Sequence, residues 1–241
     1  MVLSFLKRRP FAVVGHRGAR GLAPENTLVA LRAAISAGAD AAEFDVQRTA
    51  DGVLVASHDP VIVDDNGRRL NVRRSSYSEV ASVTVKGERL PRLEEIIAEA
   101  SGRIGLLFDV KEASDTRPLV DLLHREAAVE QSAVISFDDR AIIEARRLEP
   151  RLATGLIYFR PPGRILDCKR LGCRLVLPRY PLATEKAVAL AHRLGMLVLA
   201  WTVNSEEWAL RLARRRVDAI ATDYPDRLAK FRNSLAGGAG L

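Results

Sequence analysis

Two short segments of the chain alternate acidic and apolar residues in a pattern that could serve chemistry. In the run AEFDV, the side chains of an extended chain alternate between two faces, so Glu43 and Asp45 share one face. In the run FDVK, Asp109 and Lys111 share a face by the same rule. Neighbouring carboxylates in a low-dielectric interior repel each other, so they persist where a proton or a cation neutralises them. Three inward carboxylates beside a lysine indicate a hard-cation site for Mg²⁺ or Ca²⁺, with a buried Asp–Lys ion pair as the alternative.

Two of the four histidines stand at the ends of apolar runs. His16 follows the run FAVVG and His58 follows VLVAS, whereas His124 and His192 lie in segments with helical spacing. A histidine takes up and releases a proton near neutral pH, and two of them beside carboxylates suit general acid–base catalysis. We therefore expect His16 and His58 to form an acid–base pair around the cation, and the other two histidines to lie at the surface.

These side chains must be positioned by an alternation of strands and helices. Apolar runs predict eight strands, at Phe11–Gly15, Ala41–Val46, Ile104–Val110, Ala133–Phe137, Thr154–Tyr158, Arg174–Leu177, Leu197–Val203 and Ala219–Thr222. Three- and four-residue apolar spacing predicts helices at Leu28–Ala37, Leu93–Ala100, Leu119–Arg125, Ile142–Leu148, Ala187–Leu194 and Glu206–Leu212. Nearly continuous apolar strands separated by helices indicate a parallel sheet covered by helices. The prediction is a closed (β/α)8 TIM barrel, with a doubly wound open sheet as the alternative, because a strand count does not prove closure.

The second strand carries an addition that breaks the alternation. Asp51-Gly52 lies between two apolar runs and predicts a β-hairpin arm, because the link is too short for a parallel crossover. His58 stands at the end of this arm, and residues 59–90 form a short, polar, arginine-bearing insertion before a helix that begins near Pro91. We expect one domain over residues 1–241, with its core at about 11–232 and a flexible tail at 235–241.

The order of motifs along the chain resembles that of glycerophosphodiester phosphodiesterases. The motifs that carry the resemblance are His16-Arg17-Gly18, Pro24-Glu25-Asn26-Thr27, Glu43-x-Asp45, Thr49-x-Asp51-Gly52, His58-Asp59-Pro60, Ser136-Phe137, Trp201-Thr202-Val203-Asn204 and Thr222-Asp223-x-Pro225. They extend over nearly the whole chain, and their order makes the set specific although each motif alone is weak. The resemblance implies a phosphatidylinositol-phospholipase-C-like barrel that hydrolyses glycerophosphodiesters to sn-glycerol phosphate and an alcohol, within lipid and glycerol metabolism.

The resemblance also implies a role for each site residue. Glu43, Asp45 and Asp109 would be the ligands of a divalent metal, Mg²⁺ or Ca²⁺, and His16 and His58 would be the catalytic acid–base pair. Arg17 and Lys111 would hold the phosphate of a small-molecule glycerophosphodiester. From its position we expect Trp201 at the barrel mouth, where it could bound the glycerol pocket, with core packing as the alternative. The family usually has glutamate in place of Asp109, so this shorter side chain must draw the metal toward its strand or bind it through water.

Two other functions remain open at this point. A lysophospholipase D or a cyclising phospholipase could use the same barrel, although the arginine-rich segment at 68–74 argues against an apolar mouth for acyl chains. A non-catalytic barrel that binds metal or anions is the alternative of another class, and it would have no need for both histidines.

Composition limits the partners and the compartment. The net charge of +7 favours anionic partners, with basic clusters at 7–9, 68–69, 73–74 and 214–216. No aromatic interleaving, helix-turn-helix or zinc-finger pattern accompanies these clusters, so we expect no nucleic-acid partner. The first apolar run is too short for a signal peptide or a transmembrane segment, and Cys168 and Cys173 are too few for a disulfide framework. We therefore expect a cytoplasmic protein, of an oligomeric state that these patterns do not predict.

Overall fold

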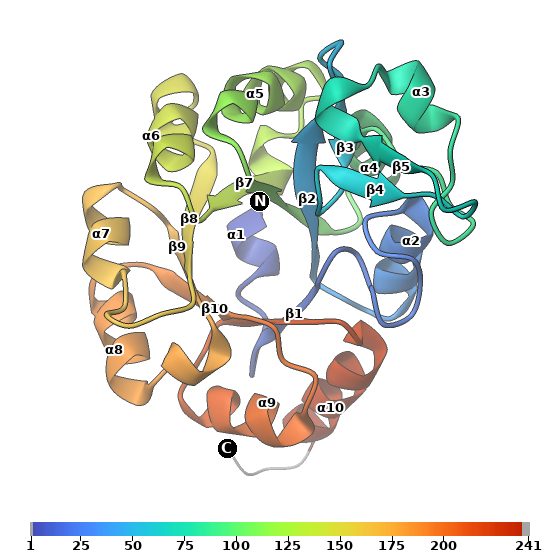
Figure 1. Ribbon diagram of the computed structural model, residues 1–241. Coiled ribbons are helices and arrows are strands. Elements are labelled where there is room, and N and C mark those ends of the chain that lie inside the picture. The colour runs from blue at the N-terminus through green and yellow to red at the C-terminus, as the bar shows by residue number, and fades with distance from the viewer. Residues whose placement is uncertain (1, 238–241) are drawn as a thin grey trace.

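Eight parallel strands form a closed barrel in the computed structural model, which describes residues 2–237 (Figure 1). The strands are β1 (Ala12–Gly15), β2 (Ala41–Arg48), β6 (Gly105–Val110), β7 (Ser132–Ser136), β8 (Ala153–Tyr158), β9 (Leu175–Pro178), β10 (Leu197–Ala200) and β11 (Ala219–Thr222). β1 pairs in parallel with β11 on one side and with β2 on the other, which closes the barrel. The predicted (β/α)8 barrel is confirmed, and the open sheet is excluded.

A helix follows each barrel strand and packs on the outside of the barrel (Figure 1). These helices are α2 (Leu28–Ser36), α4 (Leu93–Ala100), α5 (Thr116–Arg125), α6 (Asp139–Leu148), α7 (Ile165–Arg170), α8 (Glu185–Arg193), α9 (Glu206–Arg214) and α10 (Pro225–Gly237). Each buries an apolar stripe, as α5 does with Leu119 and Leu123, and leaves its polar side to solvent. Side-chain caps begin several of them, since the hydroxyl of Thr27 accepts a hydrogen bond from the backbone N–H of Ala30 at 3.0 Å.

Strand alternation separates an outer apolar face from an inner face that carries the carboxylates. Phe44 and Phe108 belong to the cluster beneath the helices, whereas Leu107 lies in the cluster that fills the barrel interior. Asp45 is directly opposite Asp109 in the parallel register of β2 and β6. The predicted shared faces are thus confirmed, and the register explains how two carboxylates far apart in sequence become neighbours.

The amino end of the barrel is covered by a short helix that the sequence patterns did not predict. This helix, α1 (Val2–Phe5), lies across the barrel opening in Figure 1. Val2 and Leu6 are buried against barrel-interior residues, and Phe5 contacts Gly105 at the start of β6. α1 therefore closes the barrel end opposite to the carboxyl ends of the strands.

The hairpin arm forms as predicted, and the insertion has more structure than its polar composition indicated. β3 (Leu54–Ala56) pairs antiparallel with the end of β2, and Gly52 in the turn has a φ of +93°. The insertion contains the antiparallel pair β4 (Val61–Val63) and β5 (Arg69–Asn71), followed by α3 (Tyr77–Ala81), beside β2 in Figure 1. It has its own apolar cluster, made of Val55, Ile62, Leu70, Val72, Val80, Val83 and Leu90. Its apolar residues are too widely spaced for a local periodicity to reveal them.

The carboxyl-terminal helix extends into the expected tail. α10 includes residues 235–237, and residues 238–241 of that tail lie outside the described residues. Among residues 2–237, none of the helices has the length and apolar character needed to cross a membrane.

Candidate active site

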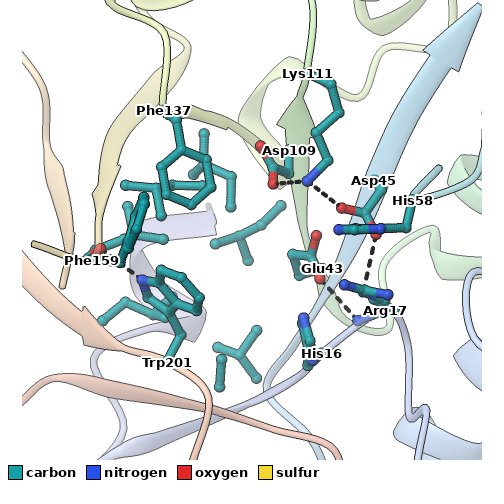
Figure 2. Close-up of a pocket in the computed structure, with 17 residues that line it drawn as sticks. His16, Arg17, Glu43, Asp45, His58, Asp109, Lys111, Phe137, Phe159 and Trp201 are labelled. Atoms are coloured by element: carbon teal, nitrogen blue, oxygen red, sulfur yellow. Dashed lines mark hydrogen bonds and ion pairs between the residues drawn. The ribbon is translucent and has the colours of Figure 1, made fainter. Parts of the chain in front are cut away.

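A cavity of about 350 Å³ opens at the carboxyl ends of the barrel strands (Figure 2). All eight residues singled out in the sequence line it: His16, Arg17, Glu43, Asp45, His58, Asp109, Lys111 and Trp201. Parallel strands bring these residues together because their carboxyl ends converge on one rim. The cavity has a charged side, from β1, β2 and β6, and an aromatic side, from β7, β8 and β10.

Three carboxylates on the charged side could hold a metal ion. Glu43, Asp45 and Asp109 are all buried, and each offers an oxygen within 4.8 Å of the others. Oδ1 of Asp109 is buried with no hydrogen-bond partner, so it is available to a cation. Hard divalent cations prefer oxygen ligands of this kind. The residues therefore fit a metal, and the shorter side chain of Asp109 still reaches the cluster.

The carboxylates differ in how strongly they are neutralised. Burial, together with the charges of Asp45 and Asp109, raises the pKa of Glu43 well above its usual range. Burial likewise raises the pKa of Asp109. Burial acts on Asp45 in the same sense, but the opposite charges of Lys111 and Arg17 outweigh it and lower the pKa of Asp45. Asp45 is thus the ionised centre of the cluster, and a cation would stabilise the ionised forms of the other two.

Lys111 and Arg17, the two side chains expected to bind phosphate, form ion pairs with the carboxylates. Nζ of Lys111 lies 2.6 Å from Oδ1 of Asp45 and also contacts Asp109. The guanidinium of Arg17 lies 3.2 Å from Asp45 through Nε and 2.8 Å from Glu25 through a terminal nitrogen. Arg17 is shared with Glu25, so these two cations do not neutralise all three carboxylates once Glu43 and Asp109 ionise, and the centre then favours a further cation.

The turn after β1 places Arg17 through two backbone conformations of positive φ. Arg17 has a φ of +50° and Gly18 a φ of +81°. A Cβ on Gly18 would lie 2.7 Å from Ala30, so only glycine fits there. The turn directs the backbone N–H of Arg17 at Glu43, with a hydrogen bond of 2.9 Å. A residue with positive φ that binds a site carboxylate is consistent with strain held at a functional site.

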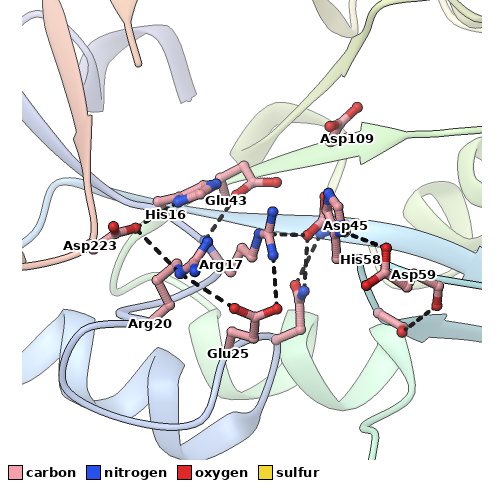
Figure 3. Close-up of polar contacts among 12 residues, drawn as sticks. His16, Arg17, Arg20, Glu25, Glu43, Asp45, His58, Asp59, Asp109 and Asp223 are labelled. Atoms are coloured by element: carbon pink, nitrogen blue, oxygen red, sulfur yellow. Dashed lines mark hydrogen bonds and ion pairs between the residues drawn. The ribbon is translucent and has the colours of Figure 1, made fainter. Parts of the chain in front are cut away.

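The motif Pro24-Glu25-Asn26-Thr27 does more than begin α2. Thr27 caps the helix, and Asn26 makes two side-chain hydrogen bonds with Asp45. Its amide N–H donates to Oδ2 of Asp45 at 2.9 Å, and its Oδ1 accepts from the backbone N–H of Asp45 at 3.1 Å. Glu25 pairs with Arg17, as Figure 3 shows. Sequence reasoning missed these supporting roles because Asn26 and Asp45 are 19 residues apart and belong to different elements.

His16 is held by groups from the barrel itself. Its Nδ1 lies 2.7 Å from Oδ1 of Asp223, at the end of β11 (Figure 3). The side-chain amide of Asn204 donates to the other oxygen of Asp223 at 2.7 Å. Burial would raise the pKa of Asp223, but hydrogen bonds from His16 and Asn204 lower it. The sequence motifs contained Asp223 and Asn204, yet no local pattern showed that they orient a histidine.

His58 enters the same cavity from the hairpin arm and is more exposed. Its side chain is 38% exposed, against 18% for His16. Its Nδ1 lies 3.0 Å from Oδ1 of Asp59, a carboxylate that is 72% exposed. The two histidines lie on either side of the Glu43–Arg17 contact in Figure 3, so both can reach a ligand bound at the carboxylates.

Three aromatic rings form the other side of the cavity. Phe137 packs edge-to-face on Phe159 and on Trp201, with ring centroids 5.9 Å and 5.8 Å apart (Figure 2). The indole N–H of Trp201 donates to the carbonyl of Leu177 at 2.8 Å, which fixes its ring in the wall. No arginine of the segment at 68–74 lines the cavity among the described residues, so that segment does not make the mouth polar.

The arrangement combines an oxygen-ligand cation site, two proton-transfer groups and two cationic side chains in one open cavity. That set is suited to an anionic ester: cations neutralise its oxygens, and the histidines move protons at the attacking and leaving oxygens. The fold and the site define a phosphoric diester hydrolase of the TIM-barrel class.

Comparison with known proteins agrees with this class. Residues 16–227 match the Glycerophosphoryl diester phosphodiesterase family, and the chain belongs to that family. It is 27% identical over 252 residues to a glycerophosphodiester phosphodiesterase of Bacillus altitudinis, covering 92% of this chain and 98% of the relative. A solved glycerophosphodiester phosphodiesterase from Parabacteroides distasonis matches with a TM-score of 0.83 and 28% identity, over 93% of this chain and 98% of that one. A phosphodiesterase from Oleispira antarctica, solved with the product sn-glycerol-3-phosphate, matches with a TM-score of 0.84 and 26% identity, over 92% and 96%.

Proposed function

We propose that the protein is a metal-dependent glycerophosphodiester phosphodiesterase that releases sn-glycerol phosphate and an alcohol by histidine acid–base catalysis. The observation that carries the proposal is the convergence of His16 and His58 on one cavity with the cluster of Glu43, Asp45 and Asp109. The product bound by the Oleispira antarctica phosphodiesterase supports the same products here. A barrel that only bound anions would not need two proton-transfer groups beside the carboxylates.

The residues of the chain divide the work of the reaction. One histidine removes a proton from the nucleophile, which is water or the glycerol hydroxyl beside the phosphate. Attack by the hydroxyl would form a cyclic glycerol phosphate, which water then opens to sn-glycerol phosphate. The other histidine donates a proton to the alcohol oxygen as its bond to phosphorus breaks. Arg17 and Lys111 stabilise the negative charge that builds on the phosphoryl oxygens in the transition state. Each proton transfer of this kind contributes typically ~10²–10⁴-fold to the rate.

Glu43, Asp45 and Asp109 would hold the divalent cation, which we propose to be Mg²⁺ or Ca²⁺. When bound, such a cation supplies Lewis-acid stabilisation of a phosphoryl oxygen. The all-oxygen donor set supports a hard cation over a softer one, because no cysteine or histidine belongs to the cluster. Calorimetric titration of the chelated protein with each ion would determine which of the two binds more tightly.

The test of the proposal is turnover that depends on metal. Purified protein should release alcohol from glycerophosphocholine, chelation with EDTA should abolish the release, and added Mg²⁺ or Ca²⁺ should restore it. Absence of EDTA-sensitive release from a panel of glycerophosphodiesters would overturn the proposal.

A second candidate is a lysophospholipase D activity on the same barrel. The wall of Phe137, Phe159 and Trp201 favours it, because an acyl chain needs an apolar surface beside the phosphate site. The rates on glycerophosphocholine and on lysophosphatidylcholine would separate the two activities. Phe159→Ala removes a ring that is 46% exposed. It should selectively lower the rate on lysophosphatidylcholine if that activity is the physiological one.

We also propose that residues 1–241 form one cytoplasmic domain. The barrel closes only when β1 pairs with β11, so segments near both ends of the described chain are needed for the fold. Cys168 and Cys173 are free and buried, which is consistent with a reducing compartment. Limited proteolysis that released a stable fragment would contradict the single domain, and cell fractionation would test the compartment.

A further inference from the structure

A buried carboxylate links the insertion to the barrel. Asp115 follows β6 and is fully buried, and the structure pairs it with two arginines. Arg73, in the insertion, lies 2.6 Å from Oδ2 and 3.3 Å from Oδ1, which makes a two-pronged contact. Arg48, at the end of β2, lies 2.9 Å from Oδ1. The hydrogen bond to Asp115 raises the pKa of Arg73.

Arg73 is also connected to His58 through hydrogen bonds of Gln47. Arg73 donates to Oε1 of Gln47 at 3.1 Å. Nε2 of Gln47 in turn donates to the backbone carbonyl of His58 at 3.3 Å. Gln47 is buried on β2 and follows Glu43 and Asp45 on the inner side of the strand, by the alternation of side chains. One chain of contacts thus joins Asp115 to the backbone of His58.

His58 needs such a support more than His16 does. The contact of its ring with Asp59 is exposed to solvent, and hydrogen bonds of that kind contribute little to rigidity. The backbone of His58 lies beyond the end of β3, outside the hydrogen-bonded ladder of the arm. Its neighbours are held by hydrogen bonds from the backbone N–H of Ser57 to the carbonyl of Asp45 at 3.1 Å and from the Ser57 hydroxyl to the carbonyl of Asp59 at 2.9 Å. The contact from Gln47 adds a direct hold on the carbonyl of His58 itself.

We propose that Arg73 is a positioning residue for the reaction, which holds the backbone of His58 through Gln47 and is itself held by buried Asp115. The insertion then serves catalysis although none of its described residues lines the cavity. The inference rests on the proposed function, because it assigns Arg73 a role only where His58 takes part in turnover.

Three variants separate this role from a merely structural one. Arg73→Gln removes the contact with Asp115, so neither residue 73 nor Gln47 keeps a fixed position. Gln47→Glu keeps an acceptor for Arg73 but has no N–H to donate to His58, so it breaks only the last link. Arg74→Gln is the matched control, because Arg74 is exposed and its side chain has no partner in the described part of the chain.

The expected result is a loss of kcat with little change in KM. Arg73→Gln should lower kcat between about tenfold and a hundredfold, because misplacing a catalytic group by ~1 Å can cost up to ~10²-fold. Gln47→Glu should lower kcat about tenfold, and calorimetry of metal binding separates this loss from an effect of the new carboxylate on the metal site. Arg74→Gln should keep kcat within twofold. NMR of the imidazole rings should show a shifted or broadened His58 signal in the first two variants and an unchanged His16 signal.

A double-mutant cycle decides whether Arg73 acts through His58. In the His58→Ala background, Arg73→Gln should lower the residual rate less than twofold, because the group that it positions is already absent. Equal fold losses in both backgrounds would overturn the inference, as would a Gln47→Glu variant with wild-type kcat and an unchanged His58 signal.

The failure of the inference is distinguishable from the failure of the proposed function. If His58→Ala lowers turnover while Arg73→Gln and Gln47→Glu behave like Arg74→Gln, the function stands and the positioning role is wrong. If His58→Ala retains wild-type turnover, the proposed acid–base pair is itself wrong, and the positioning role falls with it.

Discussion

The two histidines reach one cavity from structurally different regions. His16 follows a barrel strand, and its orienting partner, Asp223, is a half-buried residue that is 207 positions away in sequence. His58 follows the hairpin arm, and its ring partner is the adjacent, exposed Asp59. Closing the barrel therefore places and orients one histidine, whereas the other depends on the arm and on the insertion beside it.

This difference separates a fixed half of the site from an adjustable half. The carboxylates and His16 belong to barrel strands that are paired on both sides, so their positions are those of the most cooperative part of the fold. His58 is supported by a smaller unit with its own apolar cluster. An insertion can vary in length and sequence without disturbing the barrel, so the support of His58 can change there while the carboxylate cluster stays unchanged.

The largest expected effect is a loss of kcat that is similar for the two histidines. His16→Ala and His58→Ala should each lower kcat by ~10²–10⁴-fold, because each removes one proton-transfer step whatever holds the ring. Steady-state kinetics on glycerophosphocholine measures both, with the melting temperature as the control for folding. Wild-type turnover in either variant would show that the two regions do not share the chemistry.

The next largest effect should come from the carboxylate that orients His16, and it should distinguish His16 from His58. Asp223→Asn should lower kcat by about a hundredfold, because an amide does not fix the ring tautomer as a carboxylate does; the analogous change in the catalytic triad of a serine protease costs ~10⁴-fold. Kinetics with saturating metal measures the loss. A rate within threefold of wild type would mean that Asp223 does not orient His16.

A stability measurement tests the carboxylate centre between the histidines. Burial raises the pKa of Glu43 in the folded protein above its unfolded value. Its favourable contribution is therefore complete below the unfolded pKa and is lost as pH rises through the folded pKa. Glu43→Gln should raise the melting temperature of the chelated protein at pH 8, by roughly 2–4 °C for each kcal/mol relieved, and change it little at pH 4.

Added metal should reverse the order of the two melting temperatures. The wild type should gain melting temperature when Mg²⁺ or Ca²⁺ is added, since a ligand that binds only the folded state stabilises it. Glu43→Gln should gain less, because it has lost a charged ligand. Calorimetry with and without EDTA checks both statements, and an equal gain in the two proteins would remove Glu43 from the metal site.

The smallest effect belongs to the exposed partner of His58. Asp59→Asn should keep kcat within about threefold of wild type, because an exposed ion pair contributes on the order of 0–1 kcal/mol. The comparison with Asp223→Asn uses the same assay and the same substitution. A loss at Asp59 as large as that at Asp223 would mean that the two halves of the site are built alike.

Much of the barrel and of the central site could be predicted from the sequence. Alternation within β2 and β6 showed which carboxylates share a face, and Asp51-Gly52 predicted the arm that carries His58. The structure of the insertion could not be predicted, because its buried residues are scattered and find one another only across strands and turns. α1 was missed for a similar reason: four helical residues are too few for a period, and the barrel end stabilises them.

The supporting contacts of the site also lay beyond local patterns. Asn26 is 19 residues from Asp45 in sequence, so its two hydrogen bonds to Asp45 form only when β1 and β2 lie side by side. In the sequence the arginines of the insertion were only basic clusters, yet Arg73 is paired with a buried carboxylate 42 residues away.

The sequence by itself determined which side chains share a strand face, where strands end and which residue types can bind a cation or move a proton. These properties follow from covalent geometry and side-chain chemistry, which do not depend on distant contacts. Only the tertiary structure decided which strand ends meet, how the charges of Glu43, Asp45 and Asp109 are shared, and which groups orient each histidine. Those outcomes depend on barrel closure and register, because interactions between groups far apart in the chain arise only when burial and strand pairing bring them within reach.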